Sequence, residues 1–110
     1  MVTTDTFRSL ALSFPGVIEQ PHFERRAFKI VGKKIFTSLL ESARTANILL
    51  SGTEQAVFCQ YHPEAIYPVP NSYGRQGWTT FELDHLDETL VSEALYTAYQ
   101  QVISAPVKKK

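Results

Sequence analysis

The stretch AFKIVGKKIFTSLLE, residues 27–41, constrains the fold most, because two short apolar runs meet in it at a Gly-Lys turn. Gly32 supplies the positive φ angle that a tight turn often requires, and each flanking run has the length of a strand. Strands joined so closely pair antiparallel. The stretch therefore predicts a β-hairpin within an antiparallel sheet.

Three helical patterns accompany this hairpin. Near the N-terminus, apolar residues recur at the spacing of one helix face, at Phe7, Leu10, Ala11 and Phe14. Residues 54–61, EQAVFCQY, predict a second helix with Glu54, Val57, Phe58 and Tyr61 on one side. Residues 86–104 predict a long third helix with a buried stripe of Leu90, Val91, Ala94, Leu95, Ala98 and Val102. The N-cap candidates are Thr3 or Thr4, Ser51 or Thr53, and Asp84 or Asp87.

Two further strands are predicted, in TANILLS (45–51) and GWTTFEL (77–83). The second alternates, with Trp78, Thr80 and Glu82 on one face and Phe81 on the other. Residues 62–76 are expected to form a long loop. The order α-β-β-β-α-β-α predicts an α+β fold, a mainly antiparallel sheet with helices packed on one face. Residues 1–107 are expected to be a single domain and 108–110 a basic tail that follows Pro106.

Composition excludes several classes of protein. Of the 110 residues, 44% are hydrophobic and 20% are charged, as in an ordinary globular domain. No apolar run approaches the roughly 18 residues of a membrane span, so no membrane association is expected. The N-terminus has no secretory-signal pattern, and Cys59 is the single cysteine, which predicts a cytoplasmic protein.

Charge is balanced in sum but uneven along the chain. Eleven basic and eleven acidic residues cancel, which argues against a strongly basic nucleic-acid binder. Residues 25–44 nevertheless hold six cations and one carboxylate, whereas residues 82–93 hold five carboxylates and no lysine or arginine. The chain therefore predicts one basic and one acidic patch.

Signatures of catalysis or metal binding are weak. Cys59 and His62 form one C-x-x-H pair, whereas structural zinc sites usually show two close pairs. Nothing in the sequence places a base beside Cys59, and no phosphate-cradling or dinucleotide motif is present. We expect no metal, no cofactor and no enzymatic activity.

The stretches LALSFPGVIEQPHFERRAFKIVGKKIF and YGRQGWTTFEL together resemble the MmcQ/YjbR family of small bacterial proteins. The resemblance covers residues 5–104 and implies a CyaY-like or secretion-chaperone-like α+β sandwich, also described as a double-wing DNA-binding motif. Related chains often have glycine where this chain has Glu24, and this carboxylate beside Arg25 reduces the attraction for phosphate.

The resemblance and the basic group imply DNA as a partner, bound weakly, without sequence specificity and in a salt-sensitive way. About six neutralised phosphates would give a log-log salt slope near −5. The residues expected to contact DNA or another ligand are His22, Arg25, Arg26, Lys33, Lys34, Arg75 and Trp78.

Two alternatives remain open at this stage. One is a protein-interaction or chaperone-like module, with a partner or a second copy on the open sheet face. The other is a small-molecule pocket between residues 62–76 and Trp78. Gly74 and Gly77 either let a ligand approach the backbone or serve turn geometry, and Trp78 is either a core anchor or the floor of a site.

Overall fold

The computed structural model describes residues 1–105. The predicted tail at 108–110, the end of the predicted domain and Pro106 lie outside the described residues.

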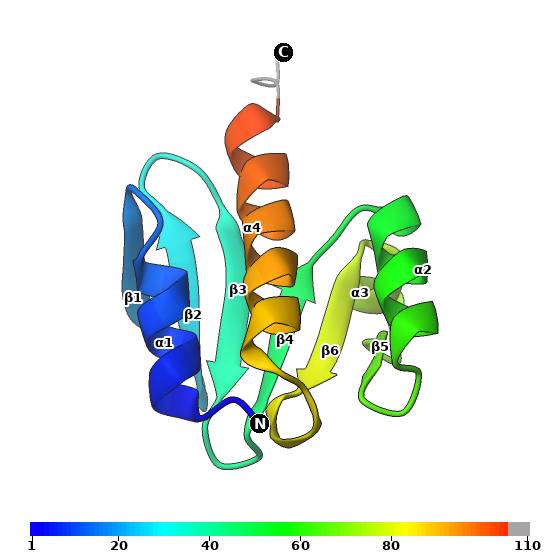
Figure 1. Ribbon diagram of the computed structural model, residues 1–110. Helices are drawn as coiled ribbons and strands as arrows, with labels where there is room; N and C mark the ends of the chain where they lie inside the picture. The colour runs from blue at the N-terminus through cyan, green and yellow to red at the C-terminus, as the bar shows by residue number, and fades with distance from the viewer. Residues whose placement is uncertain (106–110) are drawn as a thin grey trace.

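One antiparallel six-stranded sheet forms the centre of the molecule (Figure 1). Its strands lie side by side in the order β1-β2-β3-β4-β6-β5. Their bounds are Val17–His22 (β1), Arg25–Ile30 (β2), Ile35–Leu40 (β3), Thr45–Leu49 (β4), Ile66–Pro68 (β5) and Trp78–Glu82 (β6). The predicted fold class is confirmed.

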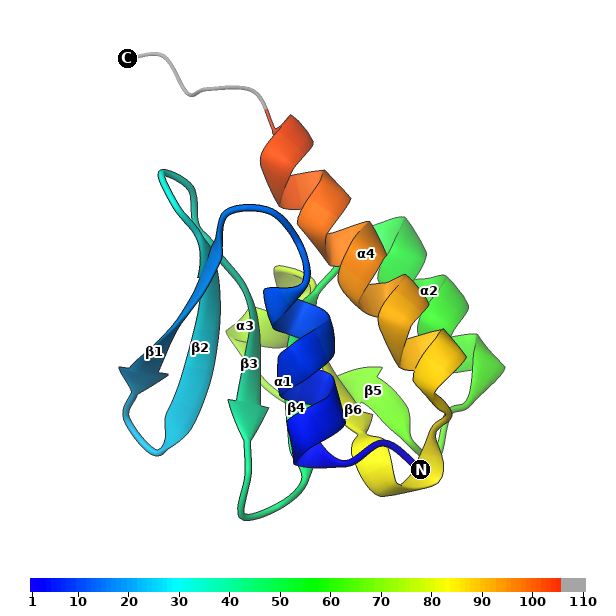
Figure 2. The same cartoon turned by 60° about the vertical axis from the view of Figure 1, so that its left-hand side comes forward.

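Three helices cover one face of this sheet, and the edge-on view in Figure 2 separates the two layers. They are α1 (Thr4–Leu12), α2 (Gly52–Tyr61) and α4 (Glu88–Ser104), with α4 over β3 and β4 and α2 beside β5. The short α3 (Ser72–Arg75) lies near the opposite face, and a 3-10 turn spans Leu83–His85. Each of the three covering helices has an N-cap residue whose side-chain oxygen accepts a backbone hydrogen bond: Thr3 for α1, Ser51 for α2 and Asp87 for α4. All three residues are among the predicted N-cap candidates.

The structure contains elements that the sequence pattern did not predict. Val17–His22 forms β1, which pairs only with β2 and therefore tolerates Pro21 at the sheet edge. The predicted loop at 62–76 contains β5 and α3. A three-residue strand and a one-turn helix are too short to show a periodicity, so only their tertiary neighbours define them.

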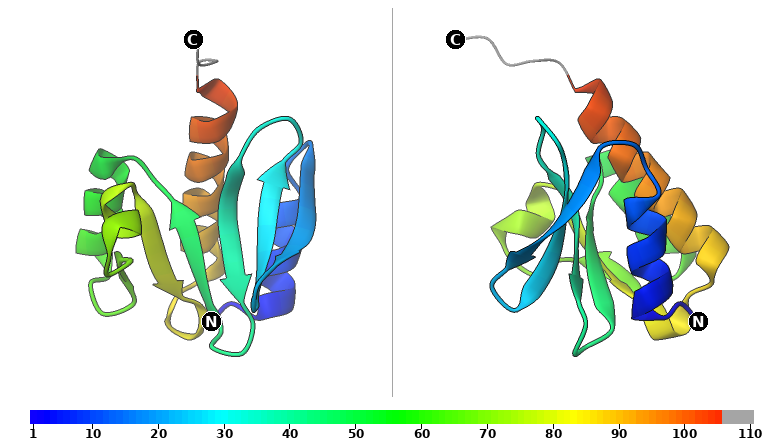
Figure 3. Two further views of the ribbon diagram at one scale, coloured as in Figure 1. Left: turned by 180° about the vertical axis from the view of Figure 1, so that it is seen from behind. Right: turned by 90° about the vertical axis from the view of Figure 1, so that its left-hand side faces the viewer.

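Side-chain alternation divides the sheet into two unlike faces. The strand registers place Ala27, Ser38, Asn47 and Thr80 in one row across β2, β3, β4 and β6. The intervening residues turn toward the helices, where the fully buried core includes Phe28, Leu39, Ile48 and Phe81. Figure 3 shows the sheet from its other face, which α1, α2 and α4 do not cover. We call this the open face.

Close backbone packing at Gly74 gives a test of the structure. A Cβ atom there would lie 1.9 Å from the Val69 carbonyl oxygen, so we expect Gly74→Ala to lower the free energy of unfolding by about 1–3 kcal/mol. Gly52→Ala is the matched control, because a Cβ at Gly52 meets nothing within 4 Å. Urea denaturation of both variants measures the difference, and equal midpoints would contradict this packing.

Candidate functional site

A depression on the open face is the candidate site. It has a volume of about 300 Å³, at the small end of ligand pockets. Its walls come from β1–β4, β6, α3 and the segment between β5 and α3. The lining residues are His22, Arg25, Ile35, Ser38, Asn47, Val69, Tyr73 and Trp78. Three of them, His22, Arg25 and Trp78, belong to the predicted set.

Arg25 is the cation of this depression. Its Nε donates a hydrogen bond to Ser38 Oγ at 2.9 Å, which fixes the orientation of the half-buried guanidinium. Its Nη2 is buried and has no hydrogen-bond partner within residues 1–105. Burial lowers the pKa of Arg25, and the charge of Glu24 acts in the opposite direction. The group remains a cation at physiological pH, with donor capacity left for an anion.

Trp78 begins β6 and lies on the open face, because Phe81 occupies the core face of the same strand. The predicted alternation is therefore confirmed. The indole is half-buried: it packs against the hydrophobic core and also lines the depression. Trp78 thus anchors the strand and forms part of the site wall.

The nearby glycines serve backbone packing. A Cβ at Gly77 would lie 1.8 Å from the Leu50 carbonyl oxygen, and Gly77 has a φ of 110°. Gly74 is packed against Val69 as described above. Of the two interpretations of these glycines, the structure supports turn and packing geometry.

Several lining residues were not predicted. Ser38 and Asn47 are polar residues next to apolar ones in β3 and β4, so their positions on the non-core face could have been found from alternation. Asn47 Oδ1 accepts a hydrogen bond from Thr80 Oγ1 at 2.8 Å, which leaves its amide N–H group as a donor. Val69 and Tyr73 carry no comparable signal, because the fold alone brings residues 62–76 to this face.

Arg26 does not join the site. It lies on the helix side of β2, where its Nε is 2.7 Å from Glu19 Oε2. Arg8 bridges the same carboxylate at 3.0 Å and Glu41 at 2.6 Å. Arg26 is thus neutralised in an ion-pair network on the opposite face from Arg25.

The other predicted cations are dispersed. Lys33 and Lys34 are exposed at the β2–β3 turn, beyond the far end of β2 from Arg25. That strand has six residues, so about 17 Å separates its ends. Arg75 is exposed on α3 and is not among the lining residues. The predicted basic residues therefore do not converge on one surface.

The β1–β2 turn projects beside the depression. His22 is exposed, and its ring centroid lies 5.0 Å from that of Phe23. Phe23 is 91% exposed and has a φ of 59°, a left-handed conformation that is unfavourable for a bulky side chain. The Phe23 side chain therefore buries little surface in the fold, and backbone strain of this kind is often found at functional sites.

Cys59 and His62 belong to no metal-binding group among the described residues. Within residues 1–105, no group of three His, Cys, Asp or Glu side chains is placed to hold a metal ion. Cys59 is half-buried, and burial raises the pKa of its thiol, which disfavours the reactive thiolate.

The comparisons with known proteins agree with this architecture. The sequence matches the YjbR family model over residues 12–101. This chain belongs to the YjbR family. The crystal structure of Deinococcus radiodurans protein DR2400, with a DUF419 domain, is similar to it with a TM-score of 0.84 and 23% sequence identity. The similarity covers 99% of this chain and 84% of that one, and at this identity it establishes the fold alone.

No curated protein matches the sequence of this YjbR family member. No helix within residues 1–105 combines the length and the apolar character needed to cross a bilayer.

The ion-pair network of Arg26 makes stability depend on pH. Burial acts to raise the pKa of Glu19, but hydrogen bonds from Arg26 and Arg8 outweigh it and leave this pKa below its usual value. A carboxylate of this kind stabilises the fold above its unfolded pKa of about 4.3, and the contribution disappears as pH falls through the folded pKa. We expect Glu19→Gln to melt at a lower temperature than the wild type at pH 7.

The same variant should lose less additional stability than the wild type between about pH 5 and pH 3, because it lacks the carboxylate that titrates there. Thermal melts across this range measure both effects. If the melting temperatures of the two proteins fall equally as the pH is lowered, the Glu19 carboxylate is not the group that stabilises the fold in this range.

Proposed function

We propose that this YjbR family member is a non-enzymatic binding protein that holds a nucleotide unit in the open-face depression. The base lies against Trp78, and the phosphate lies beside Arg25. One observation carries the proposal: an indole and a half-buried guanidinium line the same depression, and Nη2 of that guanidinium has no hydrogen-bond partner in the described part of the chain.

The energetics of Arg25 favour an anionic ligand. A buried donor without a partner costs about 1–3 kcal/mol, and a phosphate that pairs with the guanidinium would recover this cost through charge-assisted hydrogen bonds. Because Nη2 is covered, the phosphate reaches it only after a side-chain adjustment at the edge of the depression. His22 and Tyr73 are exposed at this edge and are the side chains that can move.

The other lining residues suit a planar base. Stacking of a base on an aromatic side chain contributes about 1–3 kcal/mol and is tolerant of sequence. The amide of Asn47 and the hydroxyl of Tyr73 add hydrogen-bonding groups that could contact the edge of the base. An unpaired base presents the face that such stacking needs, whereas a paired base is stacked within its duplex.

The positions of the cations favour an unpaired nucleotide over a duplex. Contact with a duplex backbone would require several convergent cations, but Arg26 is paired with Glu19 on the other face, and Lys33 and Lys34 lie beyond the far end of β2. We therefore narrow the expected DNA-binding activity to a single nucleotide, either free or within a single strand.

We expect Arg25→Met to weaken nucleotide binding at least about tenfold, because it removes the cation of the depression. Trp78 is the only tryptophan, so its fluorescence reports on this site during titration with adenosine 5′-monophosphate or decathymidylate. The thermal stability of this variant should be unchanged or higher, since an apolar side chain of similar length replaces a partly buried charge. Lys33→Met is the matched control and should bind as the wild type does.

The same titrations distinguish the sources of the nucleotide. Tighter binding of decathymidylate than of the mononucleotide indicates a single-stranded partner, and equal binding indicates a free nucleotide. One contacted phosphate gives a log-log salt slope near −0.7. A slope near −5 together with loss of binding in Lys33→Met would contradict the proposal and favour contact along the phosphate backbone.

The strained β1–β2 turn provides an independent test. Glycine adopts the left-handed conformation of Phe23 readily, so we expect Phe23→Gly to retain or slightly raise the melting temperature. Nucleotide affinity should fall, because the exposed ring that contacts His22, a lining residue of the depression, is lost. A variant that melts well below the wild type would show that Phe23 serves stability instead.

A further inference from the structure

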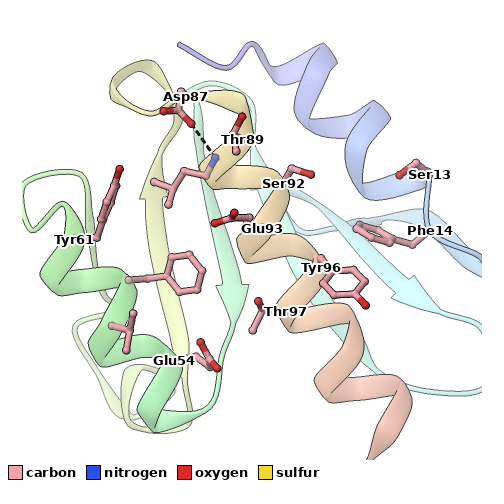
Figure 4. Close-up of a pocket in the computed structure, with 13 residues that line it drawn as sticks. Ser13, Phe14, Glu54, Tyr61, Asp87, Thr89, Ser92, Glu93, Tyr96 and Thr97 are labelled. Carbon is pink, nitrogen blue, oxygen red and sulfur yellow. Dashed lines mark hydrogen bonds between the residues drawn. The ribbon is translucent and has the colours of Figure 1, made fainter.

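A second hollow lies on the helix-covered side of the sheet, away from the open face. We define the α2–α4 groove as the space between these helices, lined by Glu54, Val57, Phe58, Tyr61, Leu90 and Glu93. It continues across α4 to Ser13 and Phe14, and the whole hollow has a volume of about 890 Å³. In Figure 4, Glu54 of α2 and Glu93 and Thr97 of α4 project into the space between the helices.

The groove exposes part of the apolar side of α2. The sequence pattern places Val57, Phe58 and Tyr61 on one side of this helix, but only Phe58 is buried, with its ring centroid 6.0 Å from that of Phe81. Val57 is 57% exposed and Tyr61 is 70% exposed. Clustered exposed apolar side chains with a polar rim are typical of interaction surfaces.

The charge of the groove has one sign. Helices α2 and α4 contain Glu54, Glu88 and Glu93 and neither contains a lysine or an arginine. Glu54 and Glu93 form no salt bridge within residues 1–105. An uncompensated acidic rim therefore borders the exposed apolar side chains.

We propose that the α2–α4 groove binds a basic amphipathic helix of another protein. A helix that enters a groove contributes apolar side chains at i, i+3 or i+4, and i+7, which suits Val57 and Tyr61 one turn apart on α2. Its flanking lysines or arginines meet Glu54 and Glu93, so the charges are complementary. The groove presents no strand edge, so strand addition does not apply to it.

The described residues of a second copy of this chain do not supply such a helix. Within residues 1–105, the only cations on helices are Arg8 and Arg75. Arg8 is held by Glu19 and Glu41, and α3, which carries Arg75, has four residues. We therefore propose a helix of a different protein as the occupant of the groove.

The test uses the full chain and two fluorescein-labelled synthetic peptides. One is LKKLLKLLKKLLKL, which forms a basic amphipathic helix, and the other has glutamate in place of every lysine. We expect fluorescence anisotropy to show that the lysine peptide binds and that the glutamate peptide binds at least about tenfold more weakly. Higher salt should lower the affinity for the lysine peptide.

Matched variants locate the contact. Glu93→Lys should lower the affinity for the lysine peptide at least about tenfold. Glu24→Lys makes the same charge reversal at the β1–β2 turn and should change this affinity less than about twofold. Tyr61→Ser should weaken binding, and Tyr73→Ser on α3 should not. All four side chains are exposed, so thermal melts should confirm that the variants fold.

Four outcomes would overturn the proposal: no binding of the lysine peptide, equal binding of the two peptides, equal effects of Glu93→Lys and Glu24→Lys, or self-association that Glu93→Lys abolishes. The last outcome, detected by sedimentation of the protein alone, would assign the groove to a second copy. None of these outcomes depends on nucleotide binding at the open face, so the two proposals can fail separately.

Discussion

Helices cover only one face of the sheet, and the rest of the structure depends on this constraint. Each strand must direct apolar side chains toward α1, α2 and α4 and can direct polar ones the other way. Phe28, Ile48 and Phe81 therefore build the core, while Asn47 and Thr80 form a polar row behind it. Helices α1, α2 and α4 leave the open face uncovered, and the depression lies on that face.

The same alternation separates two adjacent arginines. Arg25 and Arg26 follow one another in β2, so their side chains leave on opposite faces. Arg26 enters the ion-pair network of Arg8 and Glu19 and contributes to stability, whereas Arg25 is half-buried and its Nη2 has no hydrogen-bond partner among residues 1–105. An unpaired buried donor carries an energetic cost, which is why Arg25 and not Arg26 is the residue that suits a ligand.

The chain has no net charge, but its acidic and basic side chains are distributed unevenly among its elements. Among residues 1–105, the lysines and arginines lie in strands, turns, α1 and the short α3, while α2 and α4 carry carboxylates only. A nucleotide at the open face and a basic helix in the α2–α4 groove would therefore occupy opposite sides of the sheet. Simultaneous binding is sterically compatible with this arrangement, since the sheet and its core lie between the two sites.

Much of the architecture and part of the candidate site could be predicted from local pattern. The Gly32 turn, the alternation in β6 and the capping residues were predicted because each depends on residues close in sequence. Edge strand β1 was missed because Pro21 interrupts its pattern, and β5 because three residues show no period. The contribution of Tyr73 to the site could not be predicted, because it depends on where residues 62–76 fold back.

The sequence by itself determined the fold class, the one-sided amphipathicity of the sheet and the placement of Trp78 and Phe81 on opposite faces of one strand, since side-chain periodicity is a local property of the backbone. Only the tertiary structure decided which charges meet. Folding brings together segments that are distant in sequence, and their contacts decide three features of the described residues. Arg26 pairs with Glu19, Arg25 Nη2 is left without a hydrogen-bond partner, and Tyr61 is exposed in the α2–α4 groove. Electrostatic interactions and burial depend on distance in space, which a linear pattern does not contain.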